Sequence, residues 1–211
     1  MTKKTKHQEE EEQLQEEKRP WWRELLSYVG IIFFACLLAV VVNRYVVINA
    51  KIPSESMENL LKKGDRIFGC KLSYLLEDPE RYDVVMFRYP VDGETIYIKR
   101  VIGLPGETVE IKDGLIYIDG ASEPLEEDYL PEEWVVGNDG YFFEVPQDSY
   151  LMLGDNRNIS EDSRYWAQCA IDDGVAADQE EAQQYTYVHK DMLIGRAVIK
   201  YYPNFHLFLD I

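Results

Sequence analysis

The chain has 211 residues, enough for one ordinary domain with appendages, and its 46% hydrophobic and 13% aromatic content excludes a chain that is disordered throughout. Its net charge of −17 argues against nucleic acid as a partner, because phosphate binding requires a basic surface. Three cysteines cannot form a disulfide framework, so Cys36, Cys70 and Cys169 are expected to be free thiols, with a Cys70–Cys169 pair left open.

The first predicted element is a transmembrane helix at residues 24–43. An uncharged apolar run from Leu25 to Val42 would be about 27 Å long as a helix, close to the hydrocarbon core of about 30 Å. Trp21 and Trp22 stand where an interfacial aromatic belt is expected. A cleaved signal peptide fits less well because the run is long and no small-x-small site follows it. A buried helix of a soluble protein fits less well because no polar face recurs.

The charges beside this run predict its orientation. Lys18, Arg19 and Arg23 precede it, whereas Arg44 stands alone after it. The positive-inside rule therefore places residues 1–23 in the cytoplasm as a disordered tail. The chain is expected to cross the lipid bilayer of the cell membrane once, with residues 44–211 on the extracytoplasmic face.

Beyond the helix, the pattern predicts an all-β domain with an antiparallel sheet. Short runs rich in Val, Ile and Tyr alternate with turn signals, and Asp113-Gly114 is a strong hairpin signal. Residues 167–188 are acidic and rich in small residues, and we expect them to form an exposed surface insertion that is partly helical. The expected strands are Tyr45–Ile52, Val84–Tyr89, Glu94–Ile102, Thr108–Lys112, Leu115–Asp119 and Leu193–Tyr201.

Two serines, Ser54 and Ser56, follow the first expected strand in the sequence IPSESM. A serine nucleophile needs a base, and none of the three histidines lies in a polar cluster that suggests a catalytic triad. A lysine whose pKa is lowered by desolvation is the alternative base. Lys99 lies in the expected strand ETIYIKRVIG among aromatic and β-branched residues. On these residues alone, an edge strand with Lys99 and Arg100 reaching out to water is the favoured interpretation.

A polar loop, GDNRNISEDSR, runs from Gly154 to Arg164. Such a mixture of residues satisfies backbone groups through side chains, so an ordered loop is expected. Asp162 and Arg164 are candidates for an ion pair that supports a site. Asn158 begins a formal glycosylation acceptor, although the dense polar loop explains it better.

Taken together, these segments resemble the type I signal peptidases, the Ser/Lys peptidases of bacterial membranes. The resemblance spans residues 53–203 in the family's order: PSESM, GDRIFGCKLSY, YIKRVIGLPGE, GDNRNISEDSR and GRAVIKYYP. It implies that Ser56 is the nucleophile and Lys99 the general base. It also implies that Ser54 contributes to the oxyanion hole, that Ser160 hydrogen-bonds the lysine amine, and that Asp162 and Arg164 support the site.

The family resemblance implies no metal or cofactor, and secretory preproteins as partners, bound as extended strands at their signal-peptide cleavage region. The short chain resembles the Gram-positive type. Glu55, where the family usually has a small residue, and Met57 are expected at the substrate subsites, and Asn59-Leu60 replaces a common Pro-Thr. The alternatives are an inactive, membrane-tethered β-domain that acts in binding, or a self-cleaving repressor of the Ser/Lys type.

Overall fold

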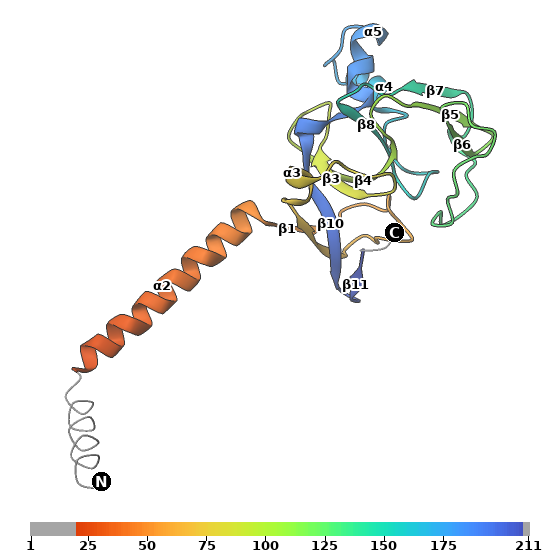
Figure 1. Ribbon diagram of the computed structural model, residues 1–211. Coiled ribbons are helices and arrows are strands. Elements are labelled where there is room, and N and C mark those ends of the chain that lie inside the picture. The colour runs from red at the N-terminus through yellow and green to blue at the C-terminus, as the bar shows by residue number, and fades with distance from the viewer. Residues whose placement is uncertain (1–19, 209–211) are drawn as a thin grey trace, which may run out of the picture. The chain divides into compact units, whose positions relative to one another are not determined.

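The computed structural model describes residues 20–208 (Figure 1). Residues 1–19 of the tail predicted at 1–23 lie outside that range, whereas residues 21–23 belong to a helix rather than to the tail. The chain divides into two units, at residues 1–44 and 45–211. Helix α2 (Trp21–Tyr45), which belongs to the first unit except for its last residue, has no buried residue and is long and apolar enough to cross a membrane. The helix includes Tyr45, which was expected to begin a strand. The strand begins instead at Val47, because the preceding apolar run contains no residue that stops a helix before Tyr45.

The second unit is built from antiparallel strands, which confirms the predicted fold class (Figure 1). The larger sheet has the order β1-β2-β10-β3-β4-β8-β9, with β11 paired to β10, and the smaller sheet has the order β6-β5-β7. The strand bounds are β1 Val47–Lys51, β2 Arg66–Cys70, β3 Val84–Arg88, β4 Ile96–Gly103, β5 Thr108–Lys112, β6 Leu115–Ile118, β7 Tyr141–Glu144, β8 Ser149–Leu153, β9 Val188–His189, β10 Leu193–Tyr202 and β11 His206–Leu207.

The β5–β6 hairpin has the predicted turn. Asp113 and Gly114 both have positive φ, at 51° and 78°, as a two-residue hairpin loop of this kind requires. Strands β2, β7, β8, β9 and β11 were not predicted. In β8, all five residues are buried, so the alternation that identifies a half-buried strand is missing.

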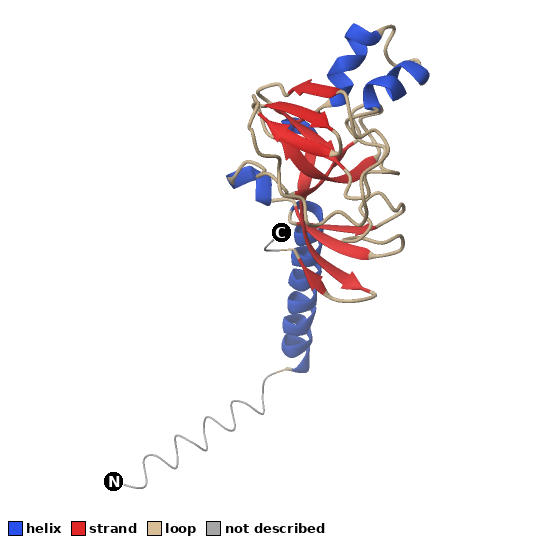
Figure 2. Cartoon of the chain, turned by 90° about the vertical axis from the view of Figure 1, so that its right-hand side faces the viewer, coloured by secondary structure: helices blue, strands red, loops and turns tan. Residues whose placement is uncertain are grey.

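Short helices lie at the edges of the sheets (Figure 2). They are α3 (Ser73–Leu76), α4 (Trp166–Asp172), α5 (Gln179–Ala182) and two 3₁₀ turns at Gln183–Thr186 and Lys190–Met192. Within the segment expected to be exposed, Ala170, Ala176 and Ala182 are buried against the core beside β3 and β4. Its small residues therefore let short helices pack closely on the domain. The three cysteines are free thiols, as expected.

The strand that carries Lys99 is central to the larger sheet. Strand β4 pairs along Ile96–Arg100 with β3, and from Arg100 to Gly103 it also pairs with β8. The part of β4 from Ile96 to Lys99 therefore has no strand on its β8 side among the described residues. This open edge lies beside the candidate site.

Gly195 allows β10 to lie close to β2, and its substitution tests that packing. A Cβ added at Gly195 would lie 2.2 Å from the carbonyl oxygen of Cys70. Because that oxygen belongs to the backbone, Gly195→Ala should lower the free energy of unfolding by about 1–3 kcal/mol. Urea unfolding of the full chain in detergent, followed by tryptophan fluorescence, measures this change. Phe142→Ala, at an exposed strand position, should have little effect, and an equal loss in both variants would contradict the prediction.

Candidate active site

The two serines lie on a shaped loop that follows β1. The hydroxyl oxygens of Ser54 and Ser56 are 3.3 Å apart and share a hydrogen bond. The Ser56 carbonyl accepts a hydrogen bond of 3.0 Å from the backbone N–H of Asn156, which ties this loop to the polar loop after β8. Met57, expected at a substrate subsite, is fully buried and fixes the loop to the core. The loop thus holds Ser56 between a core residue and a second loop.

Lys99 is buried, with only 3% of its surface exposed. Its amine donates a hydrogen bond of 3.0 Å to the Ser160 hydroxyl. Burial lowers the pKa of Lys99 from 10.5 to about 8, although the carboxylates of Asp162 and Glu161 oppose that shift. The alternative in which Lys99 and Arg100 reach out to water is therefore wrong, since Arg100 is also fully buried. A lysine that loses its proton near neutral pH can act as a base.

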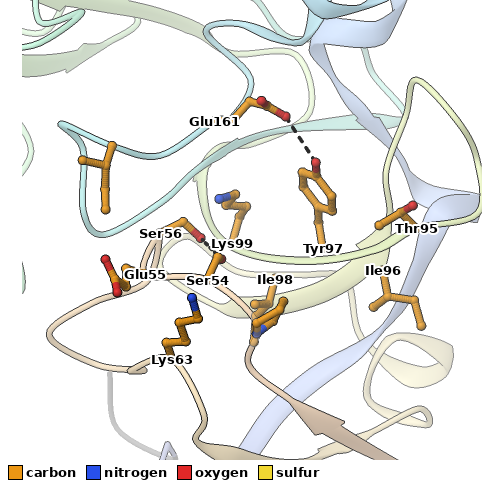
Figure 3. Close-up of a pocket in the computed structure, with 12 residues that line it drawn as sticks. Ser54, Glu55, Ser56, Lys63, Thr95, Ile96, Tyr97, Ile98, Lys99 and Glu161 are labelled. Carbon is orange, nitrogen blue, oxygen red and sulfur yellow. Dashed lines mark hydrogen bonds between the residues drawn. The ribbon is translucent and has the colours of Figure 1, made fainter.

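Ser56 and Lys99 line one cavity of about 520 Å³ (Figure 3). Within the described part of the chain they share no direct hydrogen bond, because Ser56 bonds to Ser54 and Lys99 to Ser160. Such contacts often form only when substrate is bound. Neither His189 nor His206 lines this cavity. The lining residues are Pro53, Ser54, Glu55, Ser56, Lys63, Thr95, Ile96, Tyr97, Ile98, Lys99, Ile159 and Glu161.

Asp162 and Arg164 form a buried ion pair behind the cavity. The guanidinium donates two hydrogen bonds to the carboxylate, at 2.8 and 2.9 Å, and both side chains are inaccessible to solvent. Burial alone would raise the pKa of Asp162, but Arg164, Lys99 and the Gly154 N–H together hold it below its ordinary value. Arg164 also donates to the carbonyls of Arg157 and Gly137. The pair therefore fixes the shape of the loop that carries Ser160.

The family model described as "Signal peptidase, peptidase S26" matches residues 25–202. The chain belongs to this family. It is 35% identical over 189 residues to the signal peptidase I of Leptolyngbya laminosa, covering 85% of this chain and 80% of that protein. It is 36% identical over 177 residues to probable signal peptidase I-2 of Synechocystis sp., covering 80% of this chain and 69% of that protein. It is 34% identical over 149 residues to the signal peptidase I of Bacillus licheniformis, covering 66% of this chain and 78% of that protein.

Membership of the signal peptidase family makes this chain a serine peptidase, as predicted. The similar identities to cyanobacterial and Bacillus enzymes do not single out a Gram-positive type. The structure brings the predicted residues Ser54, Ser56 and Lys99 around one cavity, with Ser160 hydrogen-bonded to the lysine amine. Glu55 is exposed and also lines the cavity.

A second buried ion pair in this signal peptidase was not identified from the sequence. Arg100 donates to both carboxylate oxygens of Asp155, at 2.7 and 2.6 Å, and to the carbonyl of Tyr82 at 2.9 Å. Its partner lies in the polar loop 55 residues further along. The sequence does contain one indication of this pair: Lys99 and Arg100 are adjacent cations, so their side chains lie on opposite faces of the strand. If both faces are buried, each cation needs its own partner.

The Asp162–Arg164 pair generates a stability prediction. Asp162→Asn leaves Arg164 buried without a counter-charge, so the free energy of unfolding should fall by about 3–5 kcal/mol. Urea unfolding of the full chain in detergent measures the change. The matched control is Asp191→Asn, whose carboxylate is exposed and only loosely paired with His189 at 3.6 Å. That variant should be nearly unchanged. A loss of similar size in both variants would count against a structural role for the buried pair.

Proposed function

We propose that this signal peptidase cleaves secretory preproteins with Ser56 as the nucleophile and unprotonated Lys99 as the general base. The observation that supports this most directly is the buried amine of Lys99, whose pKa is lowered to about 8, in the cavity that Ser56 also lines. A serine hydroxyl is a weak nucleophile until a base removes its proton. Of the two lysines that line the cavity, Lys99 is buried and Lys63 is exposed.

The reaction is an acyl transfer in two halves. The Lys99 amine takes the proton of Ser56 as its oxygen attacks the scissile carbonyl, and the resulting oxyanion accepts hydrogen bonds from the Ser54 hydroxyl and the Ser56 N–H. The Lys99 ammonium then gives its proton to the leaving amine, which releases the mature protein. Water, deprotonated by the same amine, hydrolyses the acyl-enzyme. Ser160, bonded to the amine, keeps it directed toward Ser56.

The substrate is proposed to bind as an extended strand along the open edge of β4 from Ile96 to Lys99. Backbone hydrogen bonds to that edge would give affinity, while the cavity accepts the side chains that precede the scissile bond. Small residues at the −1 and −3 positions follow from the family resemblance. Glu55, on the serine loop, is proposed to contact the substrate, whereas the buried Met57 supports the loop from beneath.

Helix α2 is proposed to anchor the enzyme in the cell membrane. The three basic residues before the apolar run from Leu25 to Val42 and the single one after it favour a cytoplasmic N-terminus and an extracytoplasmic catalytic unit. A translocated signal peptide is held in the same bilayer, so enzyme and substrate share one surface. This raises their effective concentration without any additional contact.

The dyad is tested by removing each member. Ser56→Ala and Lys99→Met should each reduce the cleavage of a preprotein by at least about 10⁴-fold, because the nucleophile and its base act as a unit. Lys63→Met, the control at the second lysine of the cavity, should retain most of the activity. Gel analysis of a purified preprotein incubated with the full chain in detergent measures the rate. Near-normal cleavage by either dyad variant would overturn the assignment, and an inactive wild type would favour the binding alternative.

The pH dependence follows from the lysine. Because the neutral amine is the active form and its pKa is about 8, kcat/KM should rise tenfold per pH unit below that value and level off above it. The pH–rate profile of the wild-type enzyme on a synthetic signal-peptide substrate provides the measurement. A rising limb centred near the ordinary lysine value of about 10.4 would show that the base is not a desolvated lysine.

A further inference from the structure

An irregular segment between β6 and β7 contacts all three parts of the chain that form the site. This segment, residues 125–138, is called the strap, and it lies outside the family motifs that the sequence displays. We propose that the strap is a positioning element for the Ser56–Lys99 pair and acts mainly through Glu127 and Tyr129. This inference rests on the function proposed above.

The first contact is with the loop that carries Ser160. Arg157, only 3% exposed, donates to the two carboxylate oxygens of Glu127 at 2.5 and 3.3 Å. The Tyr129 hydroxyl donates to Glu127 at 2.5 Å and accepts from Arg157 at 3.1 Å. The same guanidinium donates to the Gly154 carbonyl at 3.0 Å. The strap thus holds the loop through a buried ion pair that makes further hydrogen bonds to Tyr129 and Gly154.

That loop packs closely against the backbone of Ser56, and its Ser160 bonds to the Lys99 amine. A Cβ added at Gly154 would lie 2.2 Å from the Ser160 hydroxyl oxygen and 2.6 Å from the Ser56 carbonyl oxygen. Asn156, between Gly154 and Arg157, donates its backbone N–H to that same carbonyl. A shift of Arg157 would therefore move the hydrogen-bond partner of Lys99 and the backbone of the nucleophile together.

The second contact is with β4. The ring of Tyr129 lies 4.0 Å from the guanidinium carbon of Arg100, the residue that follows Lys99. Because Arg100 is fully buried and held by Asp155, this cation–π contact is desolvated, the situation in which such contacts are strongest. The strap therefore packs directly against the strand that presents the base.

The third contact is with the serine loop. The Asn59 amide donates to the Tyr129 carbonyl over 3.4 Å, and Asn59 has φ of 85°. Proline, fixed near −65°, cannot adopt that conformation, whereas asparagine does so readily. Asn59 replaces the proline common in the family, so this departure gives the serine loop a contact with the strap.

The other end of the strap is fixed by Asn158. Its amide donates to Glu132 and to the Glu133 carbonyl, each at 2.8 Å, and its oxygen accepts from the backbone N–H groups of Val135 and Val136. These bonds occupy the side chain that would accept a glycan, so the formal glycosylation motif serves the strap instead.

None of the strap residues lines the cavity. Weakening the strap should therefore affect the alignment of Ser56 with Lys99 and leave substrate binding intact. Since an error of about 1 Å in alignment costs about 100-fold in rate, a modest displacement is enough to be measured.

The test compares strap variants of the full chain in detergent on a synthetic signal-peptide substrate. Tyr129→Leu removes the ring beside Arg100 and the hydroxyl's bonds to Glu127 and Arg157 but keeps the direct Glu127–Arg157 ion pair, so the protein should fold. We expect kcat to fall by about 10–100-fold, with KM unchanged and the midpoint of the pH profile still near 8. Tyr129→Phe, which keeps the ring, should restore most of kcat.

A second pair of variants tests the charge contact independently. Glu127→Gln should lower kcat, whereas Glu126→Gln, the same change at the exposed neighbouring residue, should not. If Glu127→Gln does not fold, the kcat of Tyr129→Leu alone tests the proposal. A lower melting temperature with unchanged kcat would reduce the strap to a structural role. A raised KM with normal kcat, or a shifted pH midpoint with a normal plateau, would also overturn the proposal. Cleavage by Ser56→Ala would instead refute the proposed function itself.

Discussion

The structure depends on keeping the amine of Lys99 out of water. Burial is the largest influence on its pKa and lowers it, while the nearby carboxylates of Asp162 and Glu161 act in the opposite direction. If Asp162 were unpaired, its charge would favour the protonated amine more strongly. Arg164 both neutralises that carboxylate and itself lowers the pKa of Lys99. The Asp162–Arg164 ion pair therefore limits the rise that Asp162 causes in the pKa of Lys99, in addition to fixing the shape of the loop that carries Ser160.

Around this amine, the domain buries several arginine–carboxylate pairs, including Arg100–Asp155 and Arg157–Glu127. Buried ion pairs add little net stability, since the desolvation of both charges offsets their attraction. Their value here is geometric, because a guanidinium bound to two carboxylate oxygens has a defined orientation. The Arg100–Asp155 and Arg157–Glu127 pairs each join segments far apart in sequence, and both have one partner in the loop from Gly154 to Arg164. A loop without regular secondary structure thereby holds a defined shape.

Much of the fold could be predicted because alternation and turn chemistry are local signals. The bounds of β5 and the Asp113-Gly114 turn follow from a few adjacent residues. Strand β8 could not be found in this way, because it is buried on both faces and lacks alternation. The same limit applied to Lys99 and Arg100. Alternation put them on opposite faces, but only the three-dimensional arrangement shows that both faces are buried. The strap was missed because its contacts bridge irregular segments.

Lys99 is the last residue of β4 before its pairing with β8 begins. From Arg100 onward the strand pairs with β8 and is buried, whereas Ile96, at its start, is 54% exposed and has no strand on the β8 side. A base one residue later in the chain would face the other side of the sheet, since successive side chains alternate. A lysine at position 96, where the residue present is half exposed, would be better solvated, and burial would lower its pKa less. Because the pairing of β4 with β8 begins only at Arg100, the preceding residue, Lys99, is buried by the core and still lines the cavity that Ser56 also lines.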